Sequence, residues 1–408
     1  MRRVVITGLG AVSPLGSSLS ELWKEIEKGK PGIGPLTRFN AEALRIRVAG
    51  EARGYRPEEH FQPKELDLLD RFSQFAIVAS RAAMANSGIK TEEEEAYSTG
   101  VFMGSGCGGA ETYDASYYQL YGKRSTRLHP LTIPRLMHNA AASQICMYLG
   151  IKGPTLSIST ACASATHAIG EAFRTIRAGA ADVMLAGGSD APLTLGFFKC
   201  WEAMRVLASG NGDASTACRP FSIDREGLVI SEGAAVLVLE EYEHARRRSA
   251  DIYAEVLGYG ASADSSHITQ PSVEGPARAI EQALREAKLS PERIDYINAH
   301  GTGTKINDAI ETKAIRQAFG SSAGEISVSS TKSMHGHLMG ASGALELLIT
   351  ILAMRQGVVP PTANYRGRDP ECDLDYTPNE PRQRELRYAL SNSFAFGGLN
   401  AVLAVARI

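Results

Sequence analysis

One cysteine of this chain stands between a strand-like run and a helix-like run. Residues 155–158 are followed by Cys162 within a stretch of small residues, and Ala165, Ile169 and Phe173 then recur at helical spacing. A strand that turns directly into a helix is typical of α/β folds. Backbone N–H groups at a helix start favour negative charge, so we expect the pKa of the thiol to fall below its free value. The pattern predicts a nucleophile, although an isolated cysteine is more commonly a buried structural residue.

Short apolar runs alternate with helical patterns along the whole chain, which predicts an α/β fold. A chain of 408 residues usually exceeds one core, so two packed domains or a duplicated unit are expected. Residues 182–189 resemble residues 295–302, which suggests two similar halves. The predicted strands, the first four of them buried, are residues 4–7, 100–103, 155–158, 182–186, 253–257, 296–299, 327–330 and 401–405, and later helices are expected over 277–287 and 343–354.

Composition excludes several classes of protein. The formal net charge is −2, with 43 basic and 45 acidic side chains, so no nucleic acid or membrane surface is indicated as a partner. No apolar run is long enough to span a membrane, and the apolar start is broken by Gly8 and Gly10, unlike a signal peptide. Six cysteines without C-x-x-C spacing argue against a zinc site or a disulfide framework and favour a reducing, cytoplasmic setting.

Two histidine motifs accompany the cysteine. His300 follows an apolar run that opens into Gly and Thr residues, as at the carboxyl end of a strand where α/β folds place their sites. Lys332 and His337 stand five residues apart around a glycine, so we expect a loop that brings both into one pocket. Thiol chemistry needs a base or a hydrogen-bond donor nearby. Zinc bound by these groups is disfavoured, because they lack the paired ligand spacing of structural zinc sites.

Four motifs occur in one order: TACAS at 160–164, HGTGT at 300–304, KSMHGH at 332–337 and NSFAFGG at 392–398. Together they resemble the motifs of beta-ketoacyl-acyl-carrier-protein synthases, nearest the type II elongating enzymes. The resemblance extends from Val4 to the final strand. It implies a thiolase-like α/β fold, internally duplicated in five αβαβα layers, and a homodimer. Residues 1–250 would form the half that carries the nucleophile, and residues 251–408 the half that carries the His/Lys/His loops.

The resemblance also implies a reaction. An acyl group on the phosphopantetheine arm of acyl carrier protein would pass to Cys162, and malonyl on a second carrier would lose CO2 and attack that thioester. His300 and His337, both neutral, would donate ring N–H groups to the enolate oxygen. Backbone N–H groups of Cys162 and Phe396 would form the oxyanion hole, and Lys332 would order the pocket through Glu346. The substrates arrive on a carrier, so no cofactor and no metal is expected.

Further site residues follow from the same resemblance. Thr302 and Thr304 would bind the pantetheine amides, Phe396 would be a gate beside Phe394, and Cys107 would lie at the acyl pocket. Carrier docking is expected at a basic rim of Lys64, Arg124, Arg127 and Arg205, because carriers are acidic. Departures from the common pattern are Cys107, Lys305, His335, Ala395 and Leu399, and Asp67 and Leu68 stand where basic residues are common.

Several alternatives remain open. A ketosynthase of a specialised polyketide or polyene pathway shares these motifs, whereas a non-catalytic chain-length-factor-type partner would lack Cys162. A cysteine hydrolase of papain-like order lacks the local cysteine signature here, and a thiolase would have a cysteine in the late motif. A nicotinamide enzyme is disfavoured because Ser13 and Pro14 interrupt the would-be glycine fingerprint. The sequence does not determine acyl chain length, branching, pathway or carrier identity.

Overall fold

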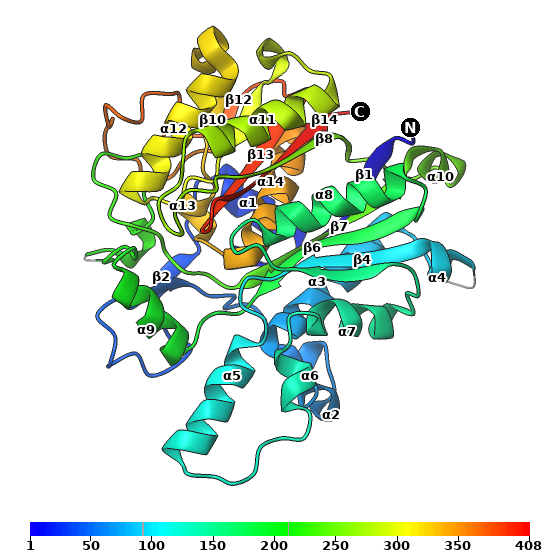
Figure 1. The fold of residues 1–408 in the computed structure, drawn as a ribbon, viewed down its shortest axis with the longest axis vertical. Helices are drawn as coiled ribbons and strands as arrows, with labels where there is room; N and C mark the ends of the chain where they lie inside the picture. The colour runs from blue at the N-terminus through cyan, green and yellow to red at the C-terminus, as the bar shows by residue number, and fades with distance from the viewer. Residues whose placement is uncertain (92–93, 211) are drawn as a thin grey trace.

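A large mixed sheet forms the centre of the molecule (Figure 1). The computed structural model describes residues 1–91, 94–210 and 212–408. The strands run in the spatial order β10-β9-β13-β14-β8-β1-β7-β6-β4-β5. Their bounds are β1 (Val4–Val12), β4 (Thr99–Gly104), β5 (Thr155–Ile158), β6 (Val183–Asp190), β7 (Gly233–Glu241), β8 (Ala254–Ala263), β9 (Tyr296–Asn298), β10 (Ser327–Ser329), β13 (Tyr388–Ala395) and β14 (Leu399–Ala406).

The sheet consists of two halves with the same topology. In β5-β4-β6-β7-β1, the strand β4 pairs in parallel with β5 and β6, while β7 lies antiparallel between β6 and β1. In β10-β9-β13-β14-β8, the strand β9 pairs in parallel with β10 and β13, while β14 lies antiparallel between β13 and β8. The halves join where β1 pairs with β8. This equivalence confirms the predicted internal duplication.

Helices complete the five layers (Figure 1). Between the half-sheets lie α8 (Ser164–Arg177), against β4 and β6, and α14 (Ser342–Gln356), against β13 and β7. One outer face is covered by α3 (Arg71–Ser87) and α7 (Ala140–Leu149), the other by α11 (Glu274–Ala287) and α12 (Lys305–Phe319). Thirteen residues of α14, from Ser342 to Met354, are buried, as expected of a helix that is covered on all sides. The predicted layering is therefore confirmed.

The remaining elements lie around these layers. An excursion formed by α5 and α6 projects from the first half, and α9 lies near α5 (Figure 1). No helix in the described parts of the chain is long and apolar enough to cross a bilayer. The bounds are α1 (Leu19–Glu27), α2 (Pro63–Leu66), α4 (Glu94–Ser98), α5 (Ala110–Tyr117), α6 (Thr132–Leu136), α9 (Leu195–Met204), α10 (Tyr242–Arg247) and α13 (Lys332–His335), with short strands β2 (Ile33–Pro35), β3 (Val48–Gly50), β11 (Val358–Val359) and β12 (Arg382–Gln383).

Three expectations about the strands were wrong in detail. Residues 155–158 form a strand, but β5 is an edge strand and Leu156 is 54% exposed. The likeness of residues 182–189 to 295–302 compares β6 with β9, whereas the topological counterpart of β6 is β13. The first strand was expected to end at Thr7, but β1 continues through Gly8 and Gly10 to Val12. A Cβ at either position would lie within 2.3 Å of an α3 carbonyl oxygen, so both glycines admit close packing.

The first turns of α8 and α14 approach closely, and this contact brings the two halves together at the site. A Cβ at Gly343 would lie 1.9 Å from the Oγ1 of Thr166 and 2.8 Å from the Oγ of Ser393. Both hydroxyl groups belong to fully buried residues, so neither can move into solvent. Gly343 therefore sets the distance between the helix that follows the nucleophile and the helix that follows His337.

We predict that Gly343→Ala destabilises the protein by about 2 kcal/mol, because overpacking outweighs the helix propensity gained with alanine. Urea unfolding measures the change. Thr166→Ala in the same chain should restore part of the loss by removing the clashing oxygen. Gly54→Ala is the matched control, since a Cβ there meets no atom within 4 Å. Stabilisation by Gly343→Ala would contradict the close approach.

Candidate active site

Cys162 occupies a tight turn between β5 and α8. The preceding residue, Ala161, has a φ of 49°, in the left-handed region that alanine rarely adopts. The Oγ of Ser164 donates to the Ala161 carbonyl oxygen (2.6 Å) and accepts from the N–H of Thr160 (2.8 Å), which fixes this turn. Ala165 packs so closely that a Cβ at Gly104 would reach its backbone nitrogen at 2.4 Å. The small residues beside the cysteine thus allow α8 to pack closely against β4.

His300 stands two residues after the end of β9. The carboxylate of Glu311 in α12 accepts the backbone N–H groups of His300 (2.8 Å) and Gly301 (2.7 Å). Asn392 of β13 donates its side-chain N–H to the same carboxylate (3.3 Å). Burial raises the pKa of Glu311 to about 7, although these hydrogen bonds oppose the rise. A buried carboxyl group from a neighbouring helix therefore holds the turn that presents His300.

His337 follows the short helix α13 and Gly336. The expected loop is therefore partly helical, since Lys332 begins α13, and His337 lines the cavity whereas Lys332 lies behind it. Its backbone N–H donates to the Val229 carbonyl oxygen (2.7 Å), and its carbonyl oxygen accepts from Ser231 (2.9 Å). A Cβ at Gly336 would lie 2.0 Å from the Oγ of Ser231, and the φ there is 72°. The His337 backbone is therefore fixed against residues 229–231 of the first half.

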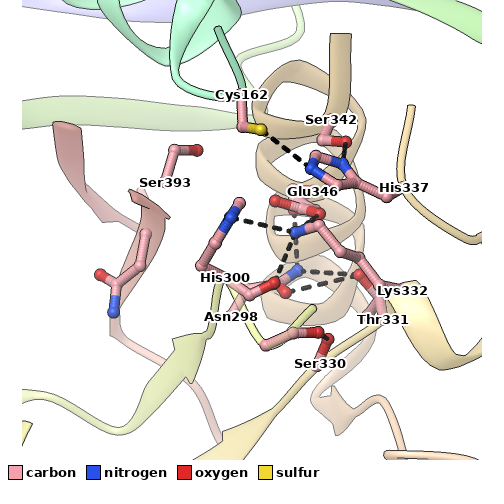
Figure 2. Close-up of polar contacts among 12 residues, drawn as sticks. Cys162, Asn298, His300, Ser330, Thr331, Lys332, His337, Ser342, Glu346 and Ser393 are labelled. Atoms are coloured by element: carbon pink, nitrogen blue, oxygen red, sulfur yellow. Dashed lines mark hydrogen bonds and ion pairs between the residues drawn. The ribbon is translucent and has the colours of Figure 1, made fainter. Parts of the chain in front are cut away.

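Cys162, His300 and His337 meet at one point in the structure (Figure 2). The Sγ of Cys162 lies 3.0 Å from the Nε2 of His337. One side-chain atom from each of the three residues lies within 4.8 Å of the others. The two imidazole rings are 5.5 Å apart at their centroids and nearly perpendicular. The structure thus joins a thiol from the first half of the chain with two imidazoles from the second.

A buried charge lies behind these rings. Lys332 pairs with the carboxylate of Glu346, and its Nζ donates to the His300 carbonyl oxygen at 2.6 Å and lies 3.4 Å from the His300 Nδ1 (Figure 2). Burial lowers the pKa of both His300 and His337 well below 6.5, and the Lys332 charge lowers each further. Both imidazoles are therefore neutral at neutral pH.

The environment of the thiol differs from the expectation. Burial raises the pKa of Cys162 from 9.0 to about 12, and the carboxylates of Asp190 and Glu346 add to the rise. Lys332 opposes the rise without overcoming it. The prediction of a lowered thiol pKa was wrong, because desolvation of a buried thiolate outweighs the helix start. The resting sulfur is a protonated thiol.

A cavity of about 270 Å³ opens over the three groups. Of the predicted residues, Thr302, Thr304, Phe394, Phe396 and Arg205 line it together with Cys162 and both histidines. Thr304 caps α12, and its hydroxyl lies 3.1 Å from that of Thr302. Cys107 lies outside this lining and packs against the buried cluster that contains Phe198 and Met339. Lys64, Arg124 and Arg127 are exposed but do not line the cavity.

The expected gate residue is at the cavity wall. Phe396 begins the turn between β13 and β14, where Gly397 and Gly398 have φ values of 81° and 68°. Its ring stacks on Trp201 of α9, with centroids 5.9 Å apart and planes 24° apart. The N–H of Gly397 donates to the Ile268 carbonyl oxygen (2.8 Å), which ties this turn to the neighbouring loop.

Sequence reasoning missed three residues of the site. Glu311 positions His300, Trp201 stacks on Phe396, and Ser342 lies 2.7 Å from the Nδ1 of His337. A buried carboxylate, an aromatic ring in a helix and a serine beside glycine and alanine carry no local signal of such roles. His335, a departure from the family pattern, contacts Thr331 and the Gly336 carbonyl oxygen and does not line the cavity.

Comparison with known proteins agrees with this geometry. Residues 1–245 match the N-terminal domain model of beta-ketoacyl synthase, and residues 253–366 match its C-terminal domain model. "Nodulation protein E" of Rhizobium sp. (strain N33) is 48% identical over 407 residues, all of both chains. "3-oxoacyl-[acyl-carrier-protein] synthase 2" of Staphylococcus aureus (strain COL) is 44% identical over 404 residues, 98% of this chain and 97% of that protein.

A solved structure is also similar. It is a complex of a type II polyketide acyl carrier protein with its ketosynthase bound to the hexaketide, and it matches with a TM-score of 0.91 and 33% identity over the whole of both chains. Two family models together cover most of the chain, and relatives of 44% and 48% identity extend over nearly all of it. This chain belongs to the beta-ketoacyl synthase family.

Proposed function

We propose that this enzyme condenses malonyl-acyl carrier protein with an acyl group held on Cys162, extending a fatty acyl or related chain by two carbons. The product is a 3-oxoacyl-acyl carrier protein. The observation that carries this proposal is the meeting of one thiol and two neutral imidazoles in a single cavity. A neutral imidazole can donate one ring N–H to developing negative charge without adding a formal charge to the pocket.

The first step is thiol exchange. The Cys162 sulfur attacks the acyl thioester carbonyl, and the carbon–sulfur bond to the pantetheine arm breaks. The proton that leaves the Cys162 thiol ends on the departing pantetheine sulfur, so the step is proton-neutral. We place the backbone N–H groups of Cys162 and Phe396 at the developing oxyanion, and the hydroxyl groups of Thr302 and Thr304 along the pantetheine arm. Both threonines line the cavity beside Phe394.

The second step needs the histidines. The bond between C2 and the carboxylate of malonyl breaks, CO2 leaves, and the electron pair moves toward the thioester oxygen as an enolate. The Nε2–H groups of His300 and His337 stabilise that oxygen. The C2 carbon then attacks the Cys162 thioester, and the released sulfur takes up one proton. Lys332, which pairs with Glu346, holds His300 in place, and burial together with the Lys332 charge keeps both rings neutral.

We propose that the enzyme uses no metal and no cofactor of its own. A histidine that binds a metal usually donates its other ring N–H to an acceptor. Here the Nδ1 of His300 faces the Lys332 ammonium, and the Nδ1 of His337 faces the Ser342 hydroxyl. The buried Lys332 charge would also repel a divalent cation. These surroundings favour donor imidazoles over metal ligands, although the three side chains are close together.

Carrier docking is proposed at the cavity mouth and the basic surface around it. Arg205 lines the cavity and is exposed, so it can meet an acidic carrier as the arm enters. Lys64, Arg124 and Arg127 would act farther from the mouth. The structural relative solved with its acyl carrier protein supports a carrier as partner.

We also propose a reducing cytoplasmic setting, which is consistent with six free thiols. We further propose that the chain divides into two halves, residues 1–250 and residues 251–408.

A polyketide ketosynthase is the second candidate. The similarity to a ketosynthase bound to a hexaketide favours it, whereas the higher identity to a 3-oxoacyl synthase favours fatty acyl elongation. A chain-length-factor role is opposed by the presence of Cys162 in contact with His337. The two candidates are separated by offering saturated acyl carriers of graded length and a 3-oxoacyl carrier in parallel. Faster acylation of Cys162 by the saturated acyl carriers would favour fatty acyl elongation, and faster acylation by the 3-oxoacyl carrier would favour a polyketide ketosynthase.

Condensation assays with malonyl carrier test the mechanism. Cys162→Ala should abolish both acylation and condensation, because no thioester can form. His300→Ala should retain acylation but lower condensation by at least about a hundredfold, because an oxyanion donor is lost. Mass spectrometry of the Cys162 peptide reports acylation, and CO2 release reports the second step. Equal loss of acylation in His300→Ala would contradict the separate roles.

The raised pKa of Cys162 predicts an unusual alkylation profile. With a pKa of about 12, the thiolate fraction grows about tenfold per pH unit across pH 7 to 10. The rate of iodoacetamide labelling of the Cys162 peptide should therefore rise through this range without a plateau. Labelling of the exposed Cys200 in the same sample shows that the reagent is active. A plateau at or below pH 8 would show a stabilised thiolate instead.

We also propose a homodimer formed at the free edge of the sheet. Among the residues that the structure describes, β5 pairs only with β4, and Leu156 on β5 and Met147 on α7 are exposed. An unpaired apolar edge strand is a ready surface for pairing with a second copy. Leu156→Lys should therefore shift the protein toward monomer in analytical ultracentrifugation. Ile268→Lys should not, because Ile268 is an exposed apolar residue that does not belong to β5. A monomeric parent protein would contradict this interface.

A further inference from the structure

The ring of His337 is held from both sides. Its Nε2 faces the Sγ of Cys162 at 3.0 Å, and its Nδ1 faces the Oγ of Ser342 at 2.7 Å (Figure 2). Ser342 is the first residue of α14, and its exposed fraction is 0%. The side of the ring turned away from the nucleophile therefore meets one buried hydroxyl group.

The direction in which the Ser342 O–H points determines which nitrogen of the neutral His337 ring is protonated. Across residues 1–91, 94–210 and 212–408, the Ser342 side chain has no hydrogen-bond partner except the Nδ1 of His337. If Nδ1 carried the ring proton, the hydroxyl would accept it and its own proton would have no acceptor. A buried donor without an acceptor is costly. The Cys162 thiol could also donate, to Nε2, but an S–H group is a weak donor and this sulfur belongs to a residue that lines the cavity. The fully buried hydroxyl therefore donates to Nδ1, and the ring proton lies on Nε2.

We infer that Ser342 is a positioning residue that holds His337 in the tautomer with Nε2 protonated, so that the ring presents a donor to the enolate oxygen of the malonyl substrate. This inference rests on the proposed condensation for its catalytic consequence. The tautomer itself follows from the resting structure. Ser342 acts only through His337 and does not line the cavity.

The Nδ1 of His300 also faces a hydrogen-bond donor, but this donor is an ammonium group. The Nζ of Lys332 lies 3.4 Å from the His300 Nδ1, so an ammonium faces the nitrogen that a hydroxyl faces in His337. Both donors come from one segment that runs from α13 into α14. A hydroxyl fixes the tautomer of His337 without placing a second cation beside the thiol. The pair of donors thus aims two Nε2–H groups into one cavity.

The test compares Ser342→Ala with Ser393→Ala in the full-length enzyme. Ser393 is also fully buried near the site, but its Oγ contacts Thr166 (2.7 Å) and not an imidazole. Nitrogen-15 NMR of histidine-labelled protein, assigned with His337→Gln, reads the tautomer without any substrate. We expect a protonated Nε2 in the parent and in Ser393→Ala, and a substantial population with protonated Nδ1 in Ser342→Ala.

Kinetics add a second readout. Ser342→Ala should lower malonyl decarboxylation about tenfold, the effect of one lost hydrogen bond of ordinary strength. Acylation of Cys162 should stay within about twofold, because thiol exchange does not need the Nε2 proton. A general loss of structure would reduce both steps. If Ser342→Ala does not fold, Ser342→Gly removes the same hydroxyl without filling space.

Two results would overturn the inference. One is a parent enzyme with the His337 proton on Nδ1, and the other is a Ser342→Ala or Ser342→Gly enzyme that retains the parent spectrum. A parent that shows the expected tautomer but no condensation would instead overturn the proposed function and leave the assignment of Ser342 standing.

Discussion

The buried ammonium of Lys332 is the charge on which the rest of the site depends. It lies beside Glu346 at the centre of the middle layer and contacts both the carbonyl oxygen and the ring of His300. A positive charge in a low-dielectric pocket acts over several ångströms. It therefore adds to burial in lowering the pKa of both imidazoles, and it lowers the pKa of the thiol against the effect of burial and two carboxylates. The resulting pocket suits chemistry in which charge develops only during the reaction.

The duplicated fold explains how such a pocket can form. Each half-sheet contributes a helix to the middle layer, and the starts of α8 and α14 meet where Gly343 faces Thr166. Cys162 precedes one helix, and His337 precedes the other. Neither half contains both the nucleophile and its partners, so the site exists only when the halves pack.

Local patterns predicted the elements near the site well. Periodicity around Cys162 and the apolar run before His300 each indicated the local structure that is observed, whereas the expected loop from Lys332 to His337 contains the short helix α13. The burial of individual side chains and the residues that they contact were harder to predict, because both depend on residues distant in sequence. Leu156 is exposed because β5 lies at an edge, and Gly8 and Gly10 lie within a strand because α3 packs against them. Cys107 is not among the residues that line the cavity and packs against a buried cluster formed by several segments of the chain.

The sequence by itself determined the α/β architecture, because short-range periodicity indicates it, and the order of four motifs, whose resemblance to those of beta-ketoacyl synthases indicated Cys162, His300 and His337 as the catalytic groups. Only the tertiary structure decided the protonation states. Burial of Cys162 raises its pKa where the helix start alone suggested the reverse, since desolvation depends on every layer that covers the sulfur. The hydroxyl that faces His337 likewise gains its role from the absence of any other acceptor within reach among the described residues, a property of packing and not of local sequence.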